Sequence, residues 1–445
     1  MFQIWIFLIG LIIMLMMMMK TKLGPFICML IASLGIGLFC GLGTDATIKA
    51  VVDGFAKTCR SIGLMVIFGT ILGIYLEKSK ACQQIAETLL RFTGTKNASG
   101  ALAATGYVVA IPVFSDVALV LLSPLVKSVA RKSGKTACSL GVVTACSLLA
   151  TNAFVAPTPA PLAVVAVLGL DVGTSIMWGL PAALVVTIAS WAFGEFYLAR
   201  KPENWFVPLE NEHTNDEAEE NDPSRMPSFV ASMAPILLPI VLILMKSIGK
   251  FILAKGSPAL MVINFLGDKN IALCIGILAA VLLLGDYLEK DKKFAPMTDA
   301  LTTAGPIVFI TAAGGALANI VSVTGVGTQI ANALAASPIP VFLIPFLITG
   351  FSKFAQGSGS VAEIMAAGLA VPLCESGLLT PLQAFLSISA GASLGSHVNN
   401  SFTWVFSEFM GYDIKTTMKT LCFCQNVVMS LSGLAAAWVI GSLVH

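Results

Sequence analysis

Ile111-Pro-Val-Phe-Ser115-Asp116 and Gln356-Gly-Ser-Gly-Ser360 are two polar interruptions in long apolar stretches of the chain. Each is followed by a second interruption that carries asparagine, Ala150-Thr151-Asn152 in the first half and His397-Val-Asn399-Asn400-Ser401 in the second. Glycine and proline weaken helices at such points, because glycine is conformationally costly and proline lacks an amide donor. We therefore expect each half of the chain to contain helices that break inside an apolar region.

The spacing of these interruptions indicates a duplication. Pro124 and Pro372 are 248 residues apart, and Asn152 and Asn400 are separated by the same 248 residues. Duplicated units with broken helices build binding sites near the middle of the membrane in many polytopic proteins.

The composition places the chain in a membrane. Of its 445 residues, 57% are hydrophobic and 11% are charged, with a mean hydropathy of +0.89, whereas soluble domains carry about 25% charged residues. Apolar stretches near the length needed to cross the bilayer, together with shorter interrupted ones, predict roughly 11 to 14 crossing elements. The stretches are continuously apolar and do not alternate, so an all-α polytopic membrane protein is expected.

The charges that flank the two copies indicate that the copies are inverted. After Pro124 the first copy carries four basic residues, Lys127, Arg131, Lys132 and Lys135. The sequence from Pro372 to Pro381 carries Glu375 and no lysine or arginine. Because basic loops stay on the cytoplasmic side, the two equivalent loops should lie on opposite sides of the membrane. The prediction is two inverted-topology repeats with re-entrant hairpins and broken helices.

An acidic segment after Arg200 divides the chain into two membrane halves. The expected units, in order, are N-terminal scaffold helices (1–60), a first repeat with broken-helix elements (61–198), an acidic hydrophilic linker (199–227), scaffold helices of the second half (228–300), a second repeat with broken-helix elements (301–420) and a C-terminal helix (421–445).

Several classes of partner are not expected. A net charge of +2 without a basic patch argues against nucleic acid, and the ten cysteines lack the spacing of a metal site or a disulfide framework. We expect no metal and no cofactor. The lipid bilayer is the expected surrounding of the chain, and a homodimer is left open.

Ionisable residues inside the apolar regions are the candidates for coupling to an ion. A charge at the centre of a span costs on the order of 2.5 to 3.5 kcal/mol on insertion scales, so it is rare there without a partner or a function. Asp116, Glu363 and His397 are the candidate proton-coupling residues, and Lys353 is a charge partner for Glu363 or an attractor of an anion. The structural alternatives are a carboxylate at a hairpin tip, an interfacial lysine and a hydrogen-bonding histidine.

Uncharged polar residues at the interruptions are the candidates for binding a solute. Backbone amides at the start of broken helices favour an anion, and asparagine and hydroxyl side chains suit a carboxylate or a polyhydroxylated ligand. The candidate solute-binding residues are Ser115, Thr151, Asn152, Gly357, Ser358, Gly359, Ser360, Asn399, Asn400 and Ser401.

Over nearly its whole length the chain resembles the gluconate permease family, the bacterial gluconate:proton symporters of the ion-transporter superfamily. The matching segments are Gly69-Thr-Ile-Leu-Gly73, Ile111-Pro-Val-Phe-Ser-Asp116, Gly357-Ser-Gly-Ser-Val-Ala362 and Ser396-His397-Val398-Asn399-Asn400. The resemblance implies a proton-coupled importer of a small hydroxylated carboxylate in the bacterial inner membrane, with two inverted repeats. It also implies elevator-like movement of a solute-carrying domain.

Two segments depart from the family pattern. The family's Pro-Pro-His-Pro segment is Ala156-Pro157-Thr158-Pro159 in this chain, and its His-Val-Asn-Asp is His397-Val398-Asn399-Asn400. A titratable histidine and a carboxylate are therefore replaced by neutral residues, which leaves the solute and the coupling ion open.

The favoured function is secondary active import of gluconate or a related sugar acid by proton symport, not enzymatic catalysis. Three alternatives remain: a transporter of another small organic anion or of a D-amino acid, coupled to Na⁺; a passive channel; and an intramembrane hydrolase with Ser393 and His397. The hydrolase is disfavoured because these two residues lie in a segment whose small residues serve helix packing.

Overall fold

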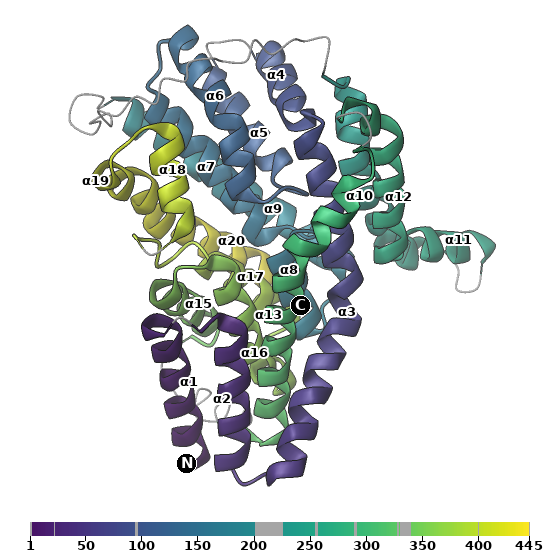
Figure 1. Cartoon of the computed structure of the whole chain (residues 1–445), viewed down its shortest axis with the longest axis vertical. Coiled ribbons are helices and arrows are strands. Elements are labelled where there is room, and N and C mark those ends of the chain that lie inside the picture. Colours follow the sequence, from purple (N-terminus) through teal and green to yellow (C-terminus); the bar gives the residue numbers. More distant parts are fainter. Residues whose placement is uncertain are drawn as a thin grey trace.

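The protein is described by a computed structural model in which helices form most of the described part of the chain (Figure 1). The structure describes residues 2–21, 23–93, 97–200, 226–253, 257–288, 292–326, 329, 340–398 and 400–444. The expected all-α class is confirmed. The predicted acidic linker falls almost wholly outside the described residues, as does Asn399.

The helices that the structure describes are, in chain order, α1 (Phe2–Lys20), α2 (Pro25–Phe39), α3 (Thr44–Lys78), α4 (Ala81–Thr93), α5 (Ala98–Val109), α6 (Ser115–Ser133), α7 (Ala137–Phe154), α8 (Pro159–Leu168), α9 (Val172–Ala192), η2 (Phe193–Tyr197), η3 (Leu198–Arg200), α10 (Phe229–Ile252), α11 (Pro258–Leu266), α12 (Lys269–Leu284), η5 (Gly285–Tyr287), α13 (Ala295–Val323), α15 (Leu343–Gln356), α16 (Gly359–Glu375), α17 (Pro381–Gly391), α18 (Ser401–Met410), α19 (Ile414–Thr417), η6 (Met418–Cys422), η7 (Cys424–Met429) and α20 (Ser430–Leu443).

The two polar interruptions that open each copy are the tips of helical hairpins. In the second copy Gly357 ends α15 with φ of 87°, a left-handed conformation that glycine adopts without steric cost. Ser358 then caps α16, because its side chain accepts a hydrogen bond from the amide of Val361. In the first copy α5 ends at Val109, and α6 begins at Ser115 after a short turn.

The two asparagine-bearing interruptions separate consecutive helices, as predicted. α7 ends at Phe154, and α8 begins at Pro159 with Thr158 at its N-cap. α17 ends at Gly391, and α18 begins at Ser401 with Asn400 as its N-cap. The order hairpin, helix, break, helix is therefore the same in both halves of the chain.

The two copies pack reciprocally. α3 lies along α13, the long helix at the equivalent place in the second half. The hairpin helix α6 packs against α18, the helix after the second break, and the hairpin helix α16 packs against α8, the helix after the first break. Such exchanged contacts are what a two-fold relation between repeats produces. The inverted orientation of the copies stays a prediction.

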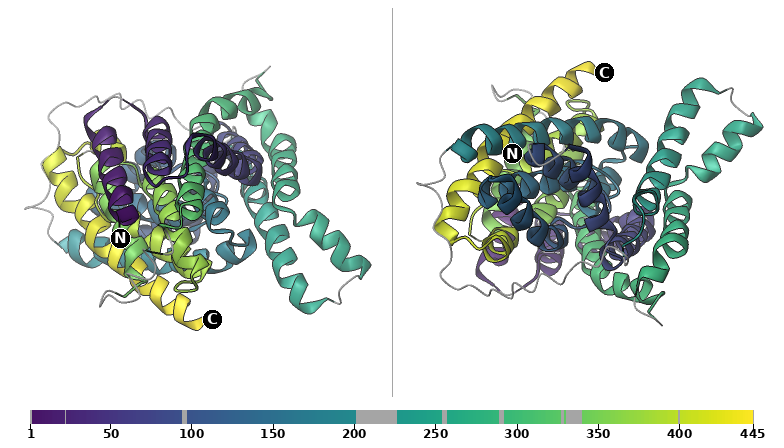
Figure 2. Two further views of the ribbon diagram at one scale, coloured as in Figure 1. Left: turned by 90° about the horizontal axis from the view of Figure 1, so that it is seen from below. Right: turned by 90° about the horizontal axis from the view of Figure 1, so that it is seen from above.

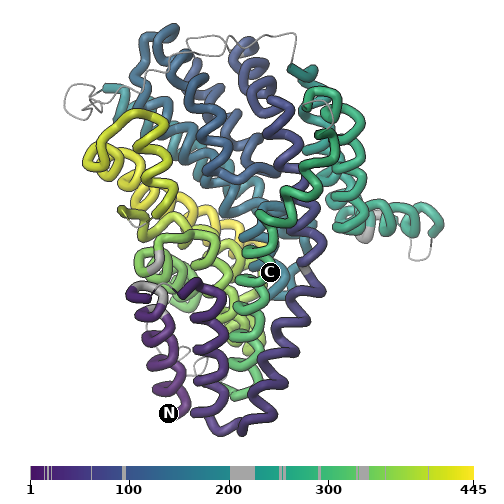
Figure 3. The backbone as a smooth tube through the Cα atoms, viewed as in Figure 1, coloured from purple at the N-terminus to yellow at the C-terminus, as the bar shows by residue number. Residues whose placement is uncertain are grey.

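The molecule is elongated, and its two ends are built from different helices. Figure 3 shows α1, α2 and the start of α3 at one end of the long axis, and α4, α5 and α6 at the other. Figure 2 shows that α10, α11 and α12 extend to one side of the main body. The broken helices lie between the two ends, so the hairpin tips and breaks of both copies meet inside the body.

Among the described helices, six are long and apolar enough to cross a membrane, and α3, bent by 43°, would be a seventh. Four shorter apolar helices, Phe2–Met14, Pro25–Phe39, Ala98–Val109 and Leu343–Ala355, accompany them. The chain is therefore a multi-pass membrane protein. The larger number of crossing elements expected from the sequence stays a prediction, as do the proposed unit boundaries.

Small residues let the helices beside the first break approach one another closely. A Cβ atom added to Gly179, in the middle of α9, would lie 2.1 Å from the main-chain oxygen of Phe154, where α7 ends. No side chain can be accommodated at that distance unless α7 and α9 separate. The absence of a side chain at Gly179 thus allows α9 to pack directly against the end of α7, beside the first break.

Replacing Gly179 with alanine is expected to destabilise the protein. Overpacking a tight contact typically costs about 1 to 3 kcal/mol, which should lower the thermal transition of the detergent-purified protein. Gly35→Ala is the matched control, because Gly35 also lies inside a helix, α2, and a Cβ there would meet no atom within 4 Å. Alanine should be neutral or stabilising at that position. Equal transitions for the two variants would contradict the argument.

Candidate functional site

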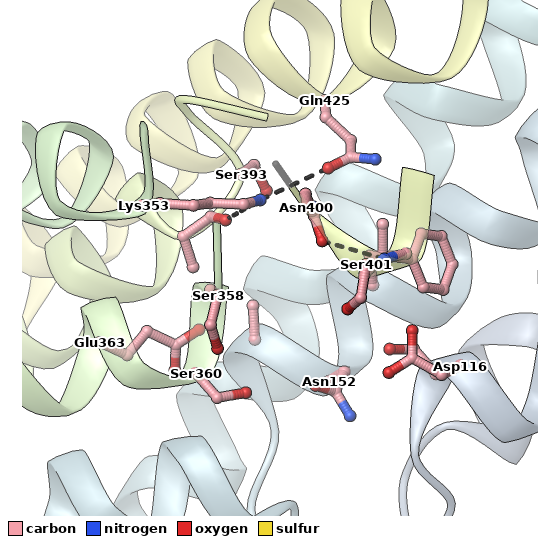
Figure 4. A pocket seen from close by; sticks show the side chains of 16 residues that line it. Asp116, Asn152, Lys353, Ser358, Ser360, Glu363, Ser393, Asn400, Ser401 and Gln425 are labelled. Carbon is pink, nitrogen blue, oxygen red and sulfur yellow. Dashed lines mark hydrogen bonds between the residues drawn. The ribbon is translucent and has the colours of Figure 1, made fainter. Parts of the chain in front are cut away.

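The hairpin tips and breaks of both copies line one cavity (Figure 4). Its volume is about 100 Å³, and since one water needs roughly 10 to 15 Å³ of such space, it has room for several waters or for a small solute. The side chains and backbone that line it are those of Ser115, Asp116, Leu149, Asn152, Ala153, Lys353, Ser358, Gly359, Ser360, Glu363, Ala392, Ser393, Asn400, Ser401, Phe402 and Gln425.

Three helices begin at this cavity. The first residues of α6, α16 and α18, namely Ser115, Gly359 and Ser401, all lie in its wall. The first turn of a helix exposes amide N–H groups that lack intrahelical acceptors, and the helix dipole is positive there. Because the three ends converge, the cavity is suited to an anionic group.

Lys353 brings a buried positive charge to one side of the cavity. Its side chain comes from the last turn of α15 and is only 3% exposed. The ammonium Nζ donates to the carbonyl oxygen of Ala392 at 2.6 Å and lies 3.4 Å from Oε1 of Gln425. Ala392 is the C-cap of α17, so the ammonium also stabilises the negative end of that helix.

Asp116 and Asn152 lie on the opposite side of the cavity from Lys353 (Figure 4). Asp116 stands in the first turn of α6, where the helix dipole stabilises a carboxylate, and its side chain is exposed to the cavity. The amide nitrogen Nδ2 of Asn152 is buried, and no described atom accepts a hydrogen bond from it. This wall therefore combines a carboxylate acceptor with an amide donor.

Glu363 is a buried carboxyl group at the cavity. It is 2% exposed and follows the first turn of α16. Within the described part of the chain, its Oε2 atom has no hydrogen-bond partner. The predicted pairing with Lys353 is not formed in this structure, because the hydrogen bonds of that ammonium go to Ala392 and Gln425.

Most of the residues predicted from the sequence come together here. The predicted residues that line the cavity are Ser115, Asp116, Asn152, Lys353, Ser358, Gly359, Ser360, Glu363, Asn400 and Ser401. They come from both halves of the chain. Whether each of them binds solute or carries a proton stays a prediction.

Three predicted residues, Thr151, Gly357 and His397, are not among those that line the cavity. Thr151 donates its hydroxyl to the carbonyl of Tyr107 at 2.9 Å. Gly357 serves as the left-handed end of α15. The ring of His397 contacts that of Phe354 in a tilted arrangement, and its Nε2 lies 2.9 Å from the carbonyl oxygen of Phe354. That arrangement is typical of a structural histidine. The hydrogen-bond partner of His397 is thus a main-chain oxygen, and not Ser393 as the hydrolase alternative would require.

Gln425 and Ser393 line the cavity but were not predicted to bind a solute. Gln425 is fully buried and belongs to η7, a π-helical segment of the last long helix. The sequence contains a signal for it, since Gln425 and Asn426 are adjacent polar residues inside an otherwise apolar run. Such a pair is costly in a membrane-spanning helix unless it has partners or a function.

Two solved structures share this fold. The YdaH transporter of Alcanivorax borkumensis superposes with a TM-score of 0.64 at 14% identity, covering 94% of this chain and 97% of that protein. MtrF of Neisseria gonorrhoeae, described as illuminating a class of antimetabolite efflux pumps, gives a TM-score of 0.65 at 13% identity over 97% of both chains. At this identity the likeness concerns the fold alone.

Sequence relatives cover almost the whole chain. An uncharacterized permease of Haemophilus influenzae is 33% identical over 96% of this chain and 90% of its own length. A high-affinity gluconate transporter of Escherichia coli is 30% identical over 98% of both chains, and an L-idonate transporter of the same organism is 27% identical over 98% of both. The model of the GntP family permeases matches residues 2–444. The chain is therefore a membrane transporter that belongs to the GntP permease family.

Proposed function

We propose that this chain imports a small hydroxylated carboxylate of the sugar-acid class by proton symport across the bacterial inner membrane. The observation that carries the proposal is the cavity itself, which combines a buried ammonium and three helix N-termini with carboxyl groups. The names of the relatives point to the same class of solute, since several are gluconate transporters and one transports L-idonate.

The polarity of the cavity supports a solute with two chemically different ends. Lys353, with the N-termini of α16 and α18, offers donors for a carboxylate. Asp116 on the far side, when ionised, can only accept hydrogen bonds, so it needs donors such as hydroxyl groups. A sugar acid carries one carboxylate and several hydroxyls, which meets both requirements. A simple anion would leave Asp116 facing a like charge.

Proton coupling is the second part of the proposal. Symport of one proton with a monovalent carboxylate moves no net charge, so the pH difference across the membrane drives accumulation, by about tenfold for each pH unit. Glu363 and Asp116 are the two carboxyl groups that reach the cavity. The alternative of Na⁺ coupling to another organic anion is favoured by one observation, namely that Thr158 and Asn400 stand where the family carries a histidine and a carboxylate.

Uptake by the purified protein in proteoliposomes tests the proposal. We expect gluconate or L-idonate to accumulate when an inward proton gradient is imposed, and accumulation to collapse on addition of a protonophore. Replacing Na⁺ with K⁺ at a fixed proton gradient should leave the rate unchanged. Radiolabelled solute retained in the vesicles is the measurement.

The controls separate the competing functions. Equilibration without accumulation would indicate a passive channel. Accumulation that requires Na⁺ would refute proton symport, and uptake of a D-amino acid in preference to every sugar acid would refute the proposed solute class.

A further inference from the structure

The buried side-chain amide of Gln425 lies in the wall of the cavity, and the proposed function gives this amide no role. Its side chain is 0% exposed, and it comes from η7, opposite the hairpin tip of α16. Its nitrogen Nε2 has no acceptor among the described residues. A donor that is both buried and unpaired is uncommon in a folded protein, and it points to an acceptor that binds there.

The neighbours of Gln425 fix which end of the amide is oxygen. Ser396 donates its hydroxyl to Oε1 at 2.5 Å, and the ammonium of Lys353 lies 3.4 Å from the same atom. An ammonium can only donate, so the atom beside it must be an acceptor. The opposite orientation would place the amide NH₂ against the ammonium. The side chain is therefore held with its two N–H donors free.

The local helix geometry holds this side chain in place. η7 is π-helical, and segments of this kind occur frequently at functional sites. The next residue, Asn426, is hydrogen-bonded to the second break. Its Oδ1 accepts from the amides of Gly395 and Ser396 at 2.7 and 2.9 Å, and its Nδ2 donates to the carbonyl of Ser396 at 2.7 Å. Gln425 is thus held by its own bond to Ser396 and by the bonds of its neighbour Asn426, and its amide is pre-oriented.

We infer that Gln425 and Lys353 together form the receptor for the carboxylate of the solute, with Gln425 as a specificity-determining residue. One carboxylate oxygen accepts from Nε2 of Gln425, and the other accepts from the ammonium, which already lies 3.4 Å from Oε1 of the same side chain. This assignment rests on the proposed function. It adds that recognition of the anion is placed at the second break, away from Asp116.

The chemistry of the solute follows from this arrangement. An amide donor beside an ammonium favours a carboxylate over a carboxamide, because a carboxamide has only one accepting oxygen and its NH₂ would face the second donor. The pair therefore predicts strong discrimination between gluconate and gluconamide, which have the same hydroxyl groups and nearly the same shape.

Competition by gluconate and by gluconamide against labelled gluconate uptake tests the inference. Gln425→Glu keeps the oxygen that accepts from Ser396 and replaces the donor with an acceptor. We expect this variant to lower the preference for gluconate over gluconamide by about 10- to 100-fold, as the loss of a charge-assisted hydrogen bond would. Gln84→Glu is the matched control, because the amide of Gln84 donates to Thr88 on α4, outside the cavity wall. It should leave the preference unchanged.

The outcomes separate direct contact from a structural role. If Gln425 only supports the break, Gln425→Glu will weaken both competitors equally and lower the thermal transition, which overturns the inference. If Gln425→Glu does not fold, Gln425→Met removes the donor without adding charge, and an unchanged preference in that variant equally overturns it.

Failure of the proposed function would look different. The wild-type protein would then take up no sugar acid. Thermal stabilisation of wild type and Gln425→Met by a panel of other small carboxylates, each compared with its carboxamide, would still measure the carboxylate preference. An equal response of the two proteins would overturn the inference in that case.

Discussion

Replacing Lys353 with methionine is expected to reduce uptake of the anionic solute by about 10- to 100-fold at limiting solute concentration. A hydrogen bond to a charged group contributes about 1.5 to 3 kcal/mol, and each 1.4 kcal/mol corresponds to a tenfold change. Lys353 is the cation in the cavity wall, and its ammonium is buried. Without it the solute carboxylate would enter a low-dielectric cavity with its charge uncompensated. The initial rate of gluconate uptake in proteoliposomes is the measurement.

Two companion variants separate the charge of Lys353 from its structural contact. Lys269→Met is the matched control, because Lys269 also donates to a main-chain oxygen, that of Ser61 at 2.8 Å, but lies outside the cavity wall. It should keep near-normal uptake even if its thermal transition falls. Lys353→Arg keeps the charge and should recover part of the activity lost in Lys353→Met. Equal uptake by Lys353→Met and Lys269→Met would show that the Lys353 charge has no role in binding.

The duplicated breaks could be predicted because their residues act locally. Gly357 must adopt a positive φ, Ser358 caps the following helix and Pro159 begins one, so each feature is determined by a few neighbouring residues. The equal spacing of Asn152 and Asn400 then indicates that two such regions exist. These local signals were sufficient to predict ten of the residues that line the cavity.

The remaining features depend on long-range contacts that no local pattern contains. Gln425 faces the cavity because a π-helical segment turns it toward Ser396, and that contact joins residues 29 positions apart. His397 was expected to handle a proton, yet its partner is the carbonyl of Phe354, 43 positions away. The polar character of both residues was visible in the sequence. The direction in which the two side chains point depends on packing between the end of α15, the second break and the last helix.

The two halves of the chain contribute unequally to the cavity. The first half supplies Asp116 and Asn152, whereas the second supplies Lys353, Glu363 and Gln425. Asp116 is exposed at a helix N-terminus, where a negative charge is stabilised. Glu363 is buried with one carboxyl oxygen unpaired. A buried carboxylate with an unpaired oxygen is unfavourable when ionised, so this residue has a physical reason to take up a proton.

Replacing Glu363 with glutamine is therefore expected to abolish proton-driven accumulation while exchange of solute continues. Glutamine resembles the protonated acid in shape and hydrogen bonding, so the variant should bind solute and move it, but it cannot release a proton. The accumulation ratio under an imposed difference of one pH unit should fall from about tenfold, the limit for one proton carried with one monovalent anion, to about one. Counterflow of labelled gluconate against internal gluconate should remain within a few-fold of wild type.

Asp116→Asn is the matched carboxyl variant, and it should give the opposite result. Because Asp116 is exposed to the cavity at the start of α6, its replacement should raise the solute concentration required for half-maximal uptake but preserve accumulation at saturation. Loss of accumulation in Asp116→Asn, with Glu363→Gln unaffected, would assign the proton to the exposed carboxylate. Loss in both variants, with counterflow retained in both, would mean that the two carboxyl groups titrate as one unit across the cavity.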